Sequence, residues 1–291
     1  MAPIVPTPVQ TPLPPLETGW LPTTPVDDTY LRQFLLNWAG MSASTALSLG
    51  GSTLDLPTVL MADSGRPAAF SNCATLMQPL SAETASATLA EIAAFFAFDD
   101  PSRRGEVLLV SVWPIGDLRP AGWSLMGHPP VFLLPAGAKP SAPPADLHIE
   151  EVRDLDALHA WERVAIEGYP LDALAGAPPG SLAAKSWLEE SRSRLWVGWV
   201  GDRPVCASSA WTEHGINGVT LVATVPEARR RGFGEALTWR AALADPSLPA
   251  MLLSSDVARP VYERMGFLPL LRITLWYRNR PDLPTLPAGP A

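Results

Sequence analysis

The sequence predicts an α/β fold with a mixed, mostly antiparallel sheet flanked by helices. Apolar segments rich in β-branched residues alternate with segments of helical period along the chain. In the second half, three strand-like segments follow one another at 194–200, 204–212 and 219–224, with short turns between them. Turns this short join antiparallel neighbours. A segment with four prolines at 135–145 separates this half from the first.

Length and composition favour two domains over one. A chain of 291 residues with 47% hydrophobic composition can bury two cores of ordinary size. We therefore expect one domain over 27–140 and a second over 146–278. Residues 1–26 carry eight prolines and are predicted to form a tail, and 279–291 form a second Pro-rich tail.

Periodicity and capping residues define the expected elements of both halves. In the first half they are a helix from Asp27 or Asp28 to about Ala39, strands at 59–62 and 68–76, a helix at 81–98, a strand at 106–113, a short helix at 117–121 and a final strand at 131–134. In the second half they are a strand at 147–152, helices at 154–166 and 181–192 around a Pro/Gly-rich loop at 170–180, the three strands above, a helix at 228–244, a strand at 250–255, a helix at 257–265 and a strand at 268–277.

Charge and cysteine usage exclude several classes of function. The net charge is −8, and no second basic cluster extends the triple arginine at 229–231, so we do not expect nucleic acid as a partner. Cys73 and Cys206 are too few and too far apart for a disulfide framework or a metal cluster, which makes a reducing cytoplasm the expected location. There is no leader-like segment and no apolar run of about 18 residues, so no membrane partner is expected.

The joint between the strand at 219–224 and the helix that follows is the most informative segment. Arg229, Arg230 and Arg231 fall near the first helical turn, where the helix dipole disfavours a cation by up to about 1 kcal/mol. A bound anion would offset this cost. Gly232 and Gly234 remove the Cβ atoms that would hold a ligand away from the backbone N–H groups. The joint therefore predicts a site for a phosphate-bearing ligand.

Two motifs in this half resemble a known family. The pattern Arg229-x-x-Gly232-x-Gly234 after a strand resembles the acetyl-CoA loop of the GNAT superfamily of N-acetyltransferases. The segment from Ala258 through Tyr262 to Gly266-Phe267 resembles a second GNAT signature, in the expected order. Ser255 stands where the family often has Asn. The resemblance covers roughly residues 146–278.

The resemblance implies acetyl-CoA as the acyl donor and an amine as the acceptor, with no metal. The pyrophosphate would lie on the N–H groups of 230–235, and the pantetheine arm would run beside the strand that ends at Val225. A backbone donor near 223–225 would stabilise the charge that develops on the thioester oxygen. The implied donor-binding residues are Ala223, Thr224, Val225, Arg229, Arg230, Arg231, Gly232, Phe233, Gly234, Glu235 and Ser255.

The resemblance also implies a general acid, and it leaves the base open. Tyr262 would donate a proton or hydrogen bond to the departing CoA thiolate; a buried structural tyrosine is the alternative. Relatives often carry a Glu on the strand before the loop, but 219–224 contains no carboxylate, so Glu213 and His214 are the nearest candidates. A reaction without a base, in which water removes the proton, is a further alternative. The residues that could line the acceptor pocket, or else pack in the core, are Tyr169, Trp187, Trp211 and the loop at 171–180.

The first half is predicted to be a degenerate copy of the same fold. An offset of 144 residues aligns 106–123 with 250–267 without a gap. In this alignment Leu118 stands in the place of Tyr262, and the helix that begins at Ser81 lacks the arginine and both glycines of the second loop. We therefore expect the first half to have no catalytic activity.

These observations favour an N-acetyltransferase that moves an acetyl group from acetyl-CoA to an unidentified amine. The alternative is a non-catalytic acyl-CoA-binding or interaction protein, for which Ser255 and the missing strand carboxylate are the arguments. The acidic net charge weakly favours a cationic amine. The oligomeric state stays open.

Overall fold

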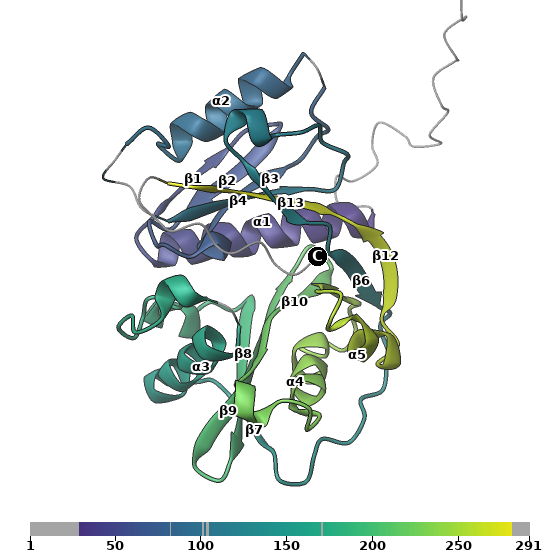
Figure 1. Ribbon diagram of the computed structural model, residues 1–291. Coiled ribbons are helices and arrows are strands. Elements are labelled where there is room, and N and C mark those ends of the chain that lie inside the picture. Colours follow the sequence, from purple (N-terminus) through teal and green to yellow (C-terminus); the bar gives the residue numbers. More distant parts are fainter. Residues whose placement is uncertain (1–28, 82, 101, 103–104, 170, 281–291) are drawn as a thin grey trace, which may run out of the picture.

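The computed structural model describes residues 29–81, 83–100, 102, 105–169 and 171–280, and Figure 1 shows their arrangement. The tail predicted at 1–26, and the second tail from residue 281, lie outside the described residues. Among the residues that are described, no helix is long and apolar enough to cross a membrane.

Helices and strands alternate in both halves. The first half contains α1 (Tyr30–Ser48), β1 (Ser52–Asp55), β2 (Val59–Asp63), β3 (Asn72–Leu76), α2 (Ala85–Phe95), β4 (Glu106–Ser111), β5 (Ser124–Gly127) and β6 (Pro130–Leu134). The second half contains β7 (His148–Glu151), α3 (Leu155–Gly168), β8 (Ser193–Val200), β9 (Arg203–Glu213), β10 (Ile216–Thr224), α4 (Phe233–Ala242), β11 (Ala250–Leu253), α5 (Arg259–Arg264), β12 (Leu268–Arg272) and β13 (Thr274–Asn279).

The strands form two mixed sheets, as the sequence predicts for an α/β fold. The first sheet has the order β1-β2-β3-β4-β13-β5, and the second sheet has the order β12-β6-β11-β10-β9-β8-β7. In Figure 1, α2 covers the outer face of the first sheet, and α1 lies on its inner face, between the two sheets. Helices α3 and α4 pack against the second sheet.

The last strand of each half lies in the sheet of the other half. Strand β6, from the first half, pairs with both β11 and β12 in the second sheet. Strand β13, at the end of the second half, pairs with both β4 and β5 in the first sheet. From the sequence, the strand at 131–134 is expected to close the first half. The structure places it in the second sheet, so neither sheet is built from one contiguous stretch of chain.

The two crossing segments contact each other where they pass between the sheets. The Ile273 N–H donates to the Pro129 carbonyl over 3.1 Å. The Arg272 guanidinium donates to the His128 carbonyl over 2.7 Å, and His128 Nδ1 lies 3.1 Å from the Thr274 hydroxyl. The predicted single strand at 268–277 is therefore wrong. It is two strands in two sheets, because the chain turns at Ile273.

The offset of 144 residues holds for the strands on both sides of the exchange. It maps Glu106, the first residue of β4, onto Ala250 at the start of β11. The same offset maps the start of β5 at Ser124 onto the start of β12, and the start of β6 at Pro130 onto the start of β13. The exchange is therefore reciprocal between equivalent strands of two similar halves.

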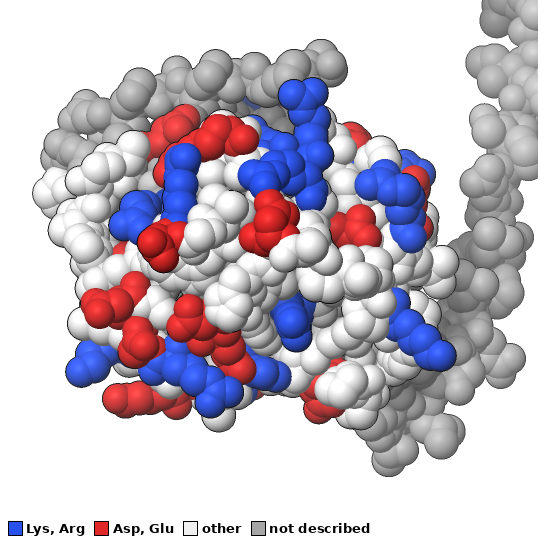
Figure 2. Space-filling view, turned by 90° about the horizontal axis from the view of Figure 1, so that it is seen from below, with Lys and Arg blue, Asp and Glu red and all other residues white. Residues whose placement is uncertain are grey.

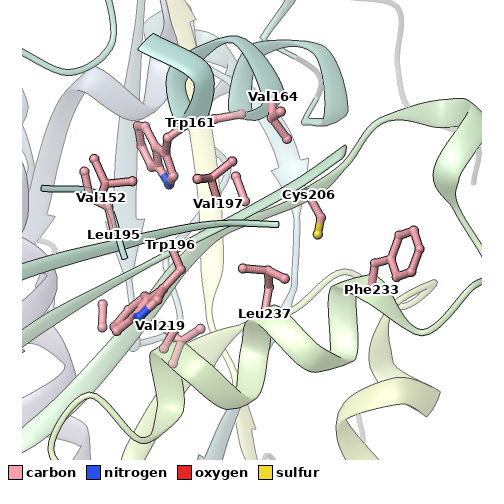
Figure 3. Close-up of a cluster of buried hydrophobic side chains, with 14 of the residues drawn as sticks. Val152, Trp161, Val164, Leu195, Trp196, Val197, Cys206, Val219, Phe233 and Leu237 are labelled. Atoms are coloured by element: carbon pink, nitrogen blue, oxygen red, sulfur yellow. The ribbon is translucent and has the colours of Figure 1, made fainter. Parts of the chain in front are cut away.

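The core of the second half lies on both faces of its sheet (Figure 3). Trp161 and Val164 of α3 pack on one face, and Phe233 and Leu237 of α4 pack on the other; all four are at most 1% exposed. Gly198 on β8 permits this close approach of α4. A Cβ at that position would lie 2.4 Å from the Cys206 sulfur and 3.1 Å from Leu237.

The prediction of a helix at 181–192 is wrong. Only a short 3₁₀ turn is present, at Lys185–Leu188. The chain just before it is held by Glu162 of α3, a side chain that is 3% exposed. Its carboxylate accepts hydrogen bonds from the N–H groups of Gly180 (2.7 Å), Leu182 (2.6 Å) and Ala183 (3.4 Å). These N–H groups bind a side chain from another helix instead of starting a helix of their own.

Other elements differ from the predictions mainly at their ends. Helix α1 continues past Gly40, because this glycine permits close packing and does not end the helix. A Cβ there would lie 2.4 Å from the Glu213 carboxylate. The short helix predicted at 117–121 is a 3₁₀ turn at Arg119–Ala121, and β1 and β5 were not predicted.

Candidate functional site

Strands β10 and β11 diverge to leave an opening in the second sheet. They pair in parallel only where Asn217–Val219 of β10 face Ala250–Leu252 of β11. Strand β10 continues to Thr224, so residues 220–224 have no described partner strand on that side. The Thr224 carbonyl accepts a hydrogen bond from Arg229, and an extended ligand can pair with the other backbone groups on this side as an added strand.

A bulge in β10 turns its backbone at this opening. Leu221 and Val222 together face the single residue Ser208 on β9, because the register shifts between Thr220 and Ala223. Leu221 has a φ of +49°, in the left-handed region that a branched side chain rarely adopts. A strained backbone of this kind is frequent at functional sites.

The pleat decides which of the expected backbone donors faces the opening. The Val225 N–H already donates to the Val205 carbonyl over 3.0 Å, on the β9 side. Donors alternate in direction along an antiparallel strand, so the Thr224 N–H points away from β9, toward the opening, and the Ala223 N–H points toward β9. Thr224 is therefore the best placed of the three.

Helix α4 begins at the same opening with free backbone donors. Gly232 caps it in the left-handed conformation, with a φ of +81°, and no side chain caps the helix. The first hydrogen bond of the helix runs from the Ala236 N–H to the Gly232 carbonyl, over 3.1 Å. The N–H groups of Phe233, Gly234 and Glu235 therefore have no partner within the helix, which is the arrangement that binds phosphate.

The three arginines before α4 have different environments. Arg229 donates to the Thr224 carbonyl and to the Gly168 carbonyl, both over 3.1 Å, and so ties the end of β10 to the end of α3. Arg231 forms an ion pair with Asp146, and its guanidinium lies 4.6 Å from the centre of the Phe233 ring. Arg230 has no hydrogen-bond or ion-pair partner within the described part of the chain.

The segment that links the two halves passes beside this helix start. The Ser141 hydroxyl donates to the Glu235 carboxylate over 2.8 Å and accepts from the Trp239 indole over 3.1 Å. A Cβ on Gly232 would lie 3.4 Å from the Pro144 ring. Seen from below, acidic and basic side chains are interspersed over the molecule (Figure 2). Acidic side chains also lie at the start of α4 itself, where Glu235 is in the first turn and Asp146 pairs with Arg231.

Tyr262 lies in the core beside the opening and is 9% exposed. Burial and the neighbouring Tyr169 raise the pKa of Tyr262 to about 12, although a hydrogen bond with Thr238 acts in the opposite direction. Its ring packs against Phe267 at 5.7 Å and against Phe132 of β6 at 6.2 Å. The phenol therefore stays protonated at neutral pH, and one side of its pocket comes from the exchanged strand.

Ser255 supports the turn into α5. Its hydroxyl accepts a hydrogen bond from the Ala258 N–H over 3.2 Å, and its carbonyl accepts from the Arg259 N–H over 3.1 Å. Serine thus supplies a side-chain cap at the position where the related motif often has Asn.

No protein-family model matches the sequence, and no curated protein matches it. Solved structures match across most of the chain. A GCN5-related N-acetyltransferase from Kribbella flavida superimposes with a TM-score of 0.61 at 19% identity, over 84% of this chain and 96% of that one. Another from Sphaerobacter thermophilus gives 0.54 at 16% identity, over 78% of each chain. A tandem GNAT protein from the clavulanic acid biosynthesis pathway gives 0.50 at 12% identity, over 89% of this chain and 96% of that one.

The chain has a GNAT fold with two GNAT-like halves.

Among the described residues of the first GNAT-like half, the strands that correspond to β10 and β11 leave no equivalent opening. Cys73–Thr75 of β3 pair with Leu108–Val110 of β4, and β3 ends one residue after this pairing, at Leu76. Leu118, which takes the place of Tyr262, is buried in an apolar cluster. The α2 helix is also not preceded by glycines. These three differences agree with the prediction that the first half does not bind an acyl donor, which stays a prediction.

The two candidate bases lie at the far end of β10. Glu213 and His214 precede the turn into Ile216, whereas Ala223 is seven residues further along the strand, a separation of about 20 Å at ~3.3 Å per residue. The Glu213 carboxylate accepts from Arg192 over 2.8 Å and from the Trp211 indole over 2.9 Å. His214 occupies the turn with a φ of +53°. Neither is brought together with Tyr262, and their role as base stays a prediction.

The other predicted acceptor residues separate into two groups. Tyr169, at the end of α3, lies at the opening, and burial raises its pKa. Its ring contacts the Phe70 ring of the first half at 5.7 Å. Trp187 and Trp211 lie elsewhere, beside α1. Sequence reasoning missed Phe70 and Phe132, because both come from the first half and no local signal connects them to this site.

The described residues contain no group of three or more His, Cys, Asp or Glu side chains that could hold a metal ion.

Proposed function

We propose that the second half transfers an acetyl group from acetyl-CoA to a primary amine. The observation that supports this proposal is the proximity of three features. The unpaired side of 220–224 lies next to the start of α4, where a Cβ on Gly234 would lie 3.5 Å from the Thr224 hydroxyl, and Tyr262 forms a hydrogen bond with Thr238 of the same helix. An extended thioester with a diphosphate needs the first two, and a thiolate leaving group needs a proton donor. The GNAT fold of the chain agrees with this assignment.

In the proposed reaction the amine nitrogen attacks the thioester carbonyl carbon, the carbon–sulfur bond breaks, and CoA leaves as the thiol. The nitrogen loses one proton to water, and Tyr262 supplies one to sulfur and is then reprotonated by solvent. The Thr224 N–H is placed to stabilise the charge that develops on the carbonyl oxygen. The residues assigned to the diphosphate are Phe233, Gly234 and Glu235, through their N–H groups, together with the Arg230 side chain.

The experiment is release of CoA thiol in the presence of a panel of primary amines, read with a colorimetric thiol reagent. Both protein thiols are buried, and burial raises the pKa of Cys73 to about 11 and of Cys206 to about 12. The folded protein will therefore contribute no colour of its own near pH 8. Thiol release that depends on the amine supports the transferase, and its absence with every amine, despite bound acetyl-CoA, contradicts it.

Tyr262→Phe is expected to lower kcat by about 100-fold, because it removes the proton donor to sulfur. Binding of acetyl-CoA, measured by calorimetry, should stay within about twofold, because the ring and its packing are kept. Since the pKa of Tyr262 is about 12, the wild-type rate should show no loss from its deprotonation below about pH 10. An unchanged kcat in the variant would remove the acid role from Tyr262.

A second candidate function is an acyl-CoA-binding protein without transferase activity. It is favoured by the absence of any carboxylate on β10 and by the ion pair that holds Glu213 at the far end of the strand. Calorimetry and thiol release together distinguish the two functions, because a binding protein gives heat with acetyl-CoA and no thiol with any amine.

A further inference from the structure

A cleft of about 530 Å³ lies between the two halves, apart from the opening beside Tyr262. One side is α1, another is the face of β1–β3 that α1 packs on, and the third comes from the second half, including Glu190, Arg192 and the β9–β10 turn. The turn lies about 20 Å along β10 from Ala223, at ~3.3 Å per residue. A ligand in this cleft would therefore be remote from the proposed site of acetyl transfer.

A row of three side chains crosses the sheet face that lines the cleft. Asp55 on β1 is paired with Leu60 on β2, and Leu60 is paired with Thr75 on β3. Directly opposed residues lie on the same face of a sheet. Cys73, two residues before Thr75, also shares this face and packs in the cluster that contains Trp38 of α1. The row therefore lies on the α1 side of the sheet, where it forms part of the cleft wall.

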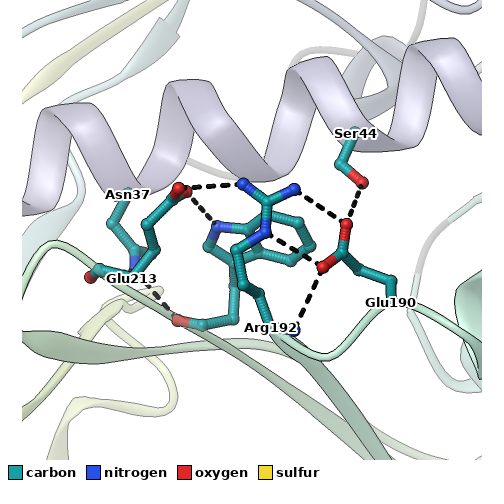
Figure 4. Close-up of polar contacts among 6 residues, drawn as sticks. Asn37, Ser44, Glu190, Arg192 and Glu213 are labelled. Carbon is teal, nitrogen blue, oxygen red and sulfur yellow. Dashed lines mark hydrogen bonds and ion pairs between the residues drawn. The ribbon is translucent and has the colours of Figure 1, made fainter.

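The cleft carries an excess of negative charge. Arg192 donates to both Glu190 and Glu213 over 2.8 Å, so one guanidinium serves two carboxylates (Figure 4). The Arg192 guanidinium holds the pKa of Glu190 at about 2, so this carboxylate is ionised at neutral pH. Asp55, an exposed residue at the end of β1, adds a further carboxylate to the lining of the cleft.

Two buried polar groups at the cleft have no partner. The Thr75 hydroxyl belongs to a side chain that is 1% exposed, and the Trp187 indole N–H to one that is 5% exposed. Neither forms a hydrogen bond within the described ranges, although buried polar groups are almost always paired. Leu47 of α1, which also lines the cleft, is by contrast 57% exposed. The cleft thus combines buried polar groups that lack hydrogen bonds, more carboxylates than cationic groups, and an exposed apolar side chain.

We propose that this cleft is a second ligand site and binds an organic cation with an apolar body, of the alkylamine or arylalkylamine class. The ammonium group lies against Asp55 and the carboxylate pair, and the apolar body covers Leu47 and Leu60. In this proposal the bound ligand supplies a hydrogen-bond partner to the Thr75 hydroxyl. The site is independent of the proposed acetyl transfer, because it uses neither α4 nor Tyr262.

The test uses the full chain and three probes of one shape: 4-phenylbutylamine, 4-phenylbutanol and 4-phenylbutyrate, each followed by ligand-observed NMR. The amine is expected to bind about tenfold more tightly than the alcohol, the effect of roughly one well-placed charge near a protein surface, and the carboxylate is expected not to bind. Equal binding of amine and alcohol, or no amine binding at millimolar concentration, would overturn the proposal. So would displacement of the amine by CoA, because it would place the probe in the other opening.

Variants locate the bound amine. Asp55→Asn and Leu47→Lys should each weaken amine binding by about tenfold, the first by removing a carboxylate and the second by placing a cation in the cleft. Leu125→Lys is the matched control, because it adds the same charge at a side chain that is 46% exposed on β5 and does not line the cleft. Thr75→Val keeps the shape and should fold normally while also weakening the amine. If Leu47→Lys and Leu125→Lys have the same effect, the cleft is not the site.

Discussion

Gly234→Leu is expected to abolish measurable CoA binding without lowering the stability of the protein. Gly234 lies in the first turn of α4, where a Cβ would meet only the Thr224 hydroxyl, at 3.5 Å. A larger side chain extends from there over the free N–H groups of the helix start. The loss of two hydrogen bonds to a charged group, each worth about 1.5–3 kcal/mol, corresponds to at least about 100-fold in affinity. The helix itself gains up to about 1 kcal/mol of propensity.

Two measurements on the same material test this outcome. Calorimetric titration with CoA reports the affinity, and urea unfolding reports the stability. Gly116→Leu is the matched control, because Gly116 has no neighbour within 4 Å of an added Cβ and lies outside the site. Retained CoA affinity in a folded Gly234→Leu protein would show that the diphosphate does not bind at the start of α4.

Asp63→Ala is expected to lower the free energy of unfolding by about 3–5 kcal/mol, which is a large part of the 5–15 kcal/mol typical of a folded domain. The Asp63 carboxylate on β2 accepts from the Arg280 guanidinium over 2.6 Å, and the two side chains are 2% and 0% exposed. Arg280 directly follows the exchanged strand β13 and lies over the Phe96 ring. Removal of the carboxylate breaks this buried ion pair, at the point where the exchanged strand is held to the first sheet.

A surface ion pair just before the other end of β13 serves as the comparison. Asp256 and Arg272 are bonded over 2.6 Å, but their side chains are 65% and 44% exposed. Asp256→Ala should therefore cost no more than about 1 kcal/mol. The double variant Asp63→Leu with Arg280→Met should be more stable than Asp63→Ala, because it replaces both charges of the pair with apolar side chains. Equal effects of Asp63→Ala and Asp256→Ala in urea unfolding would refute the fastening role of Asp63.

The sequence was most informative where structure is decided locally. The helix predicted at 228–244 is present as α4, because its apolar period and the proline that ends the preceding strand are local signals, but it begins five residues later, at Phe233. The three arginines therefore precede the first turn of the helix. The three antiparallel strands β8, β9 and β10 follow from their period and from the turns at Gly201 and Gly215, both of which have a positive φ. The offset of 144 residues indicated two similar halves, and the strand positions agree with it.

The features that sequence reasoning missed depend on contacts between distant segments. A helix was predicted at 181–192 because the composition permits one. In the structure the buried Glu162 carboxylate binds the backbone N–H groups at the start of this segment, so they do not begin a helix. The exchange of β6 and β13 has no local signature, because each strand has the same alternation whichever sheet it joins. For the same reason Phe132 and Phe70 were not foreseen as neighbours of Tyr262 and Tyr169. The bulge at Leu221 was also missed, because leucine gives no sign of a left-handed backbone.

The reciprocal exchange of strands means that the two halves are interlocked. A sequence-specific protease site can be inserted between Gly137 and Ala138, in the exposed linking segment. After cleavage, the last strand of the amino-terminal fragment, β6, would lie inside the sheet of the other fragment, and the last strand of that fragment, β13, would lie inside the amino-terminal sheet. Cleavage of the folded protein should therefore leave a complex that elutes from a sizing column as one species until denaturant is added. Each fragment expressed alone would have a gap in its sheet, with exposed edges on both sides.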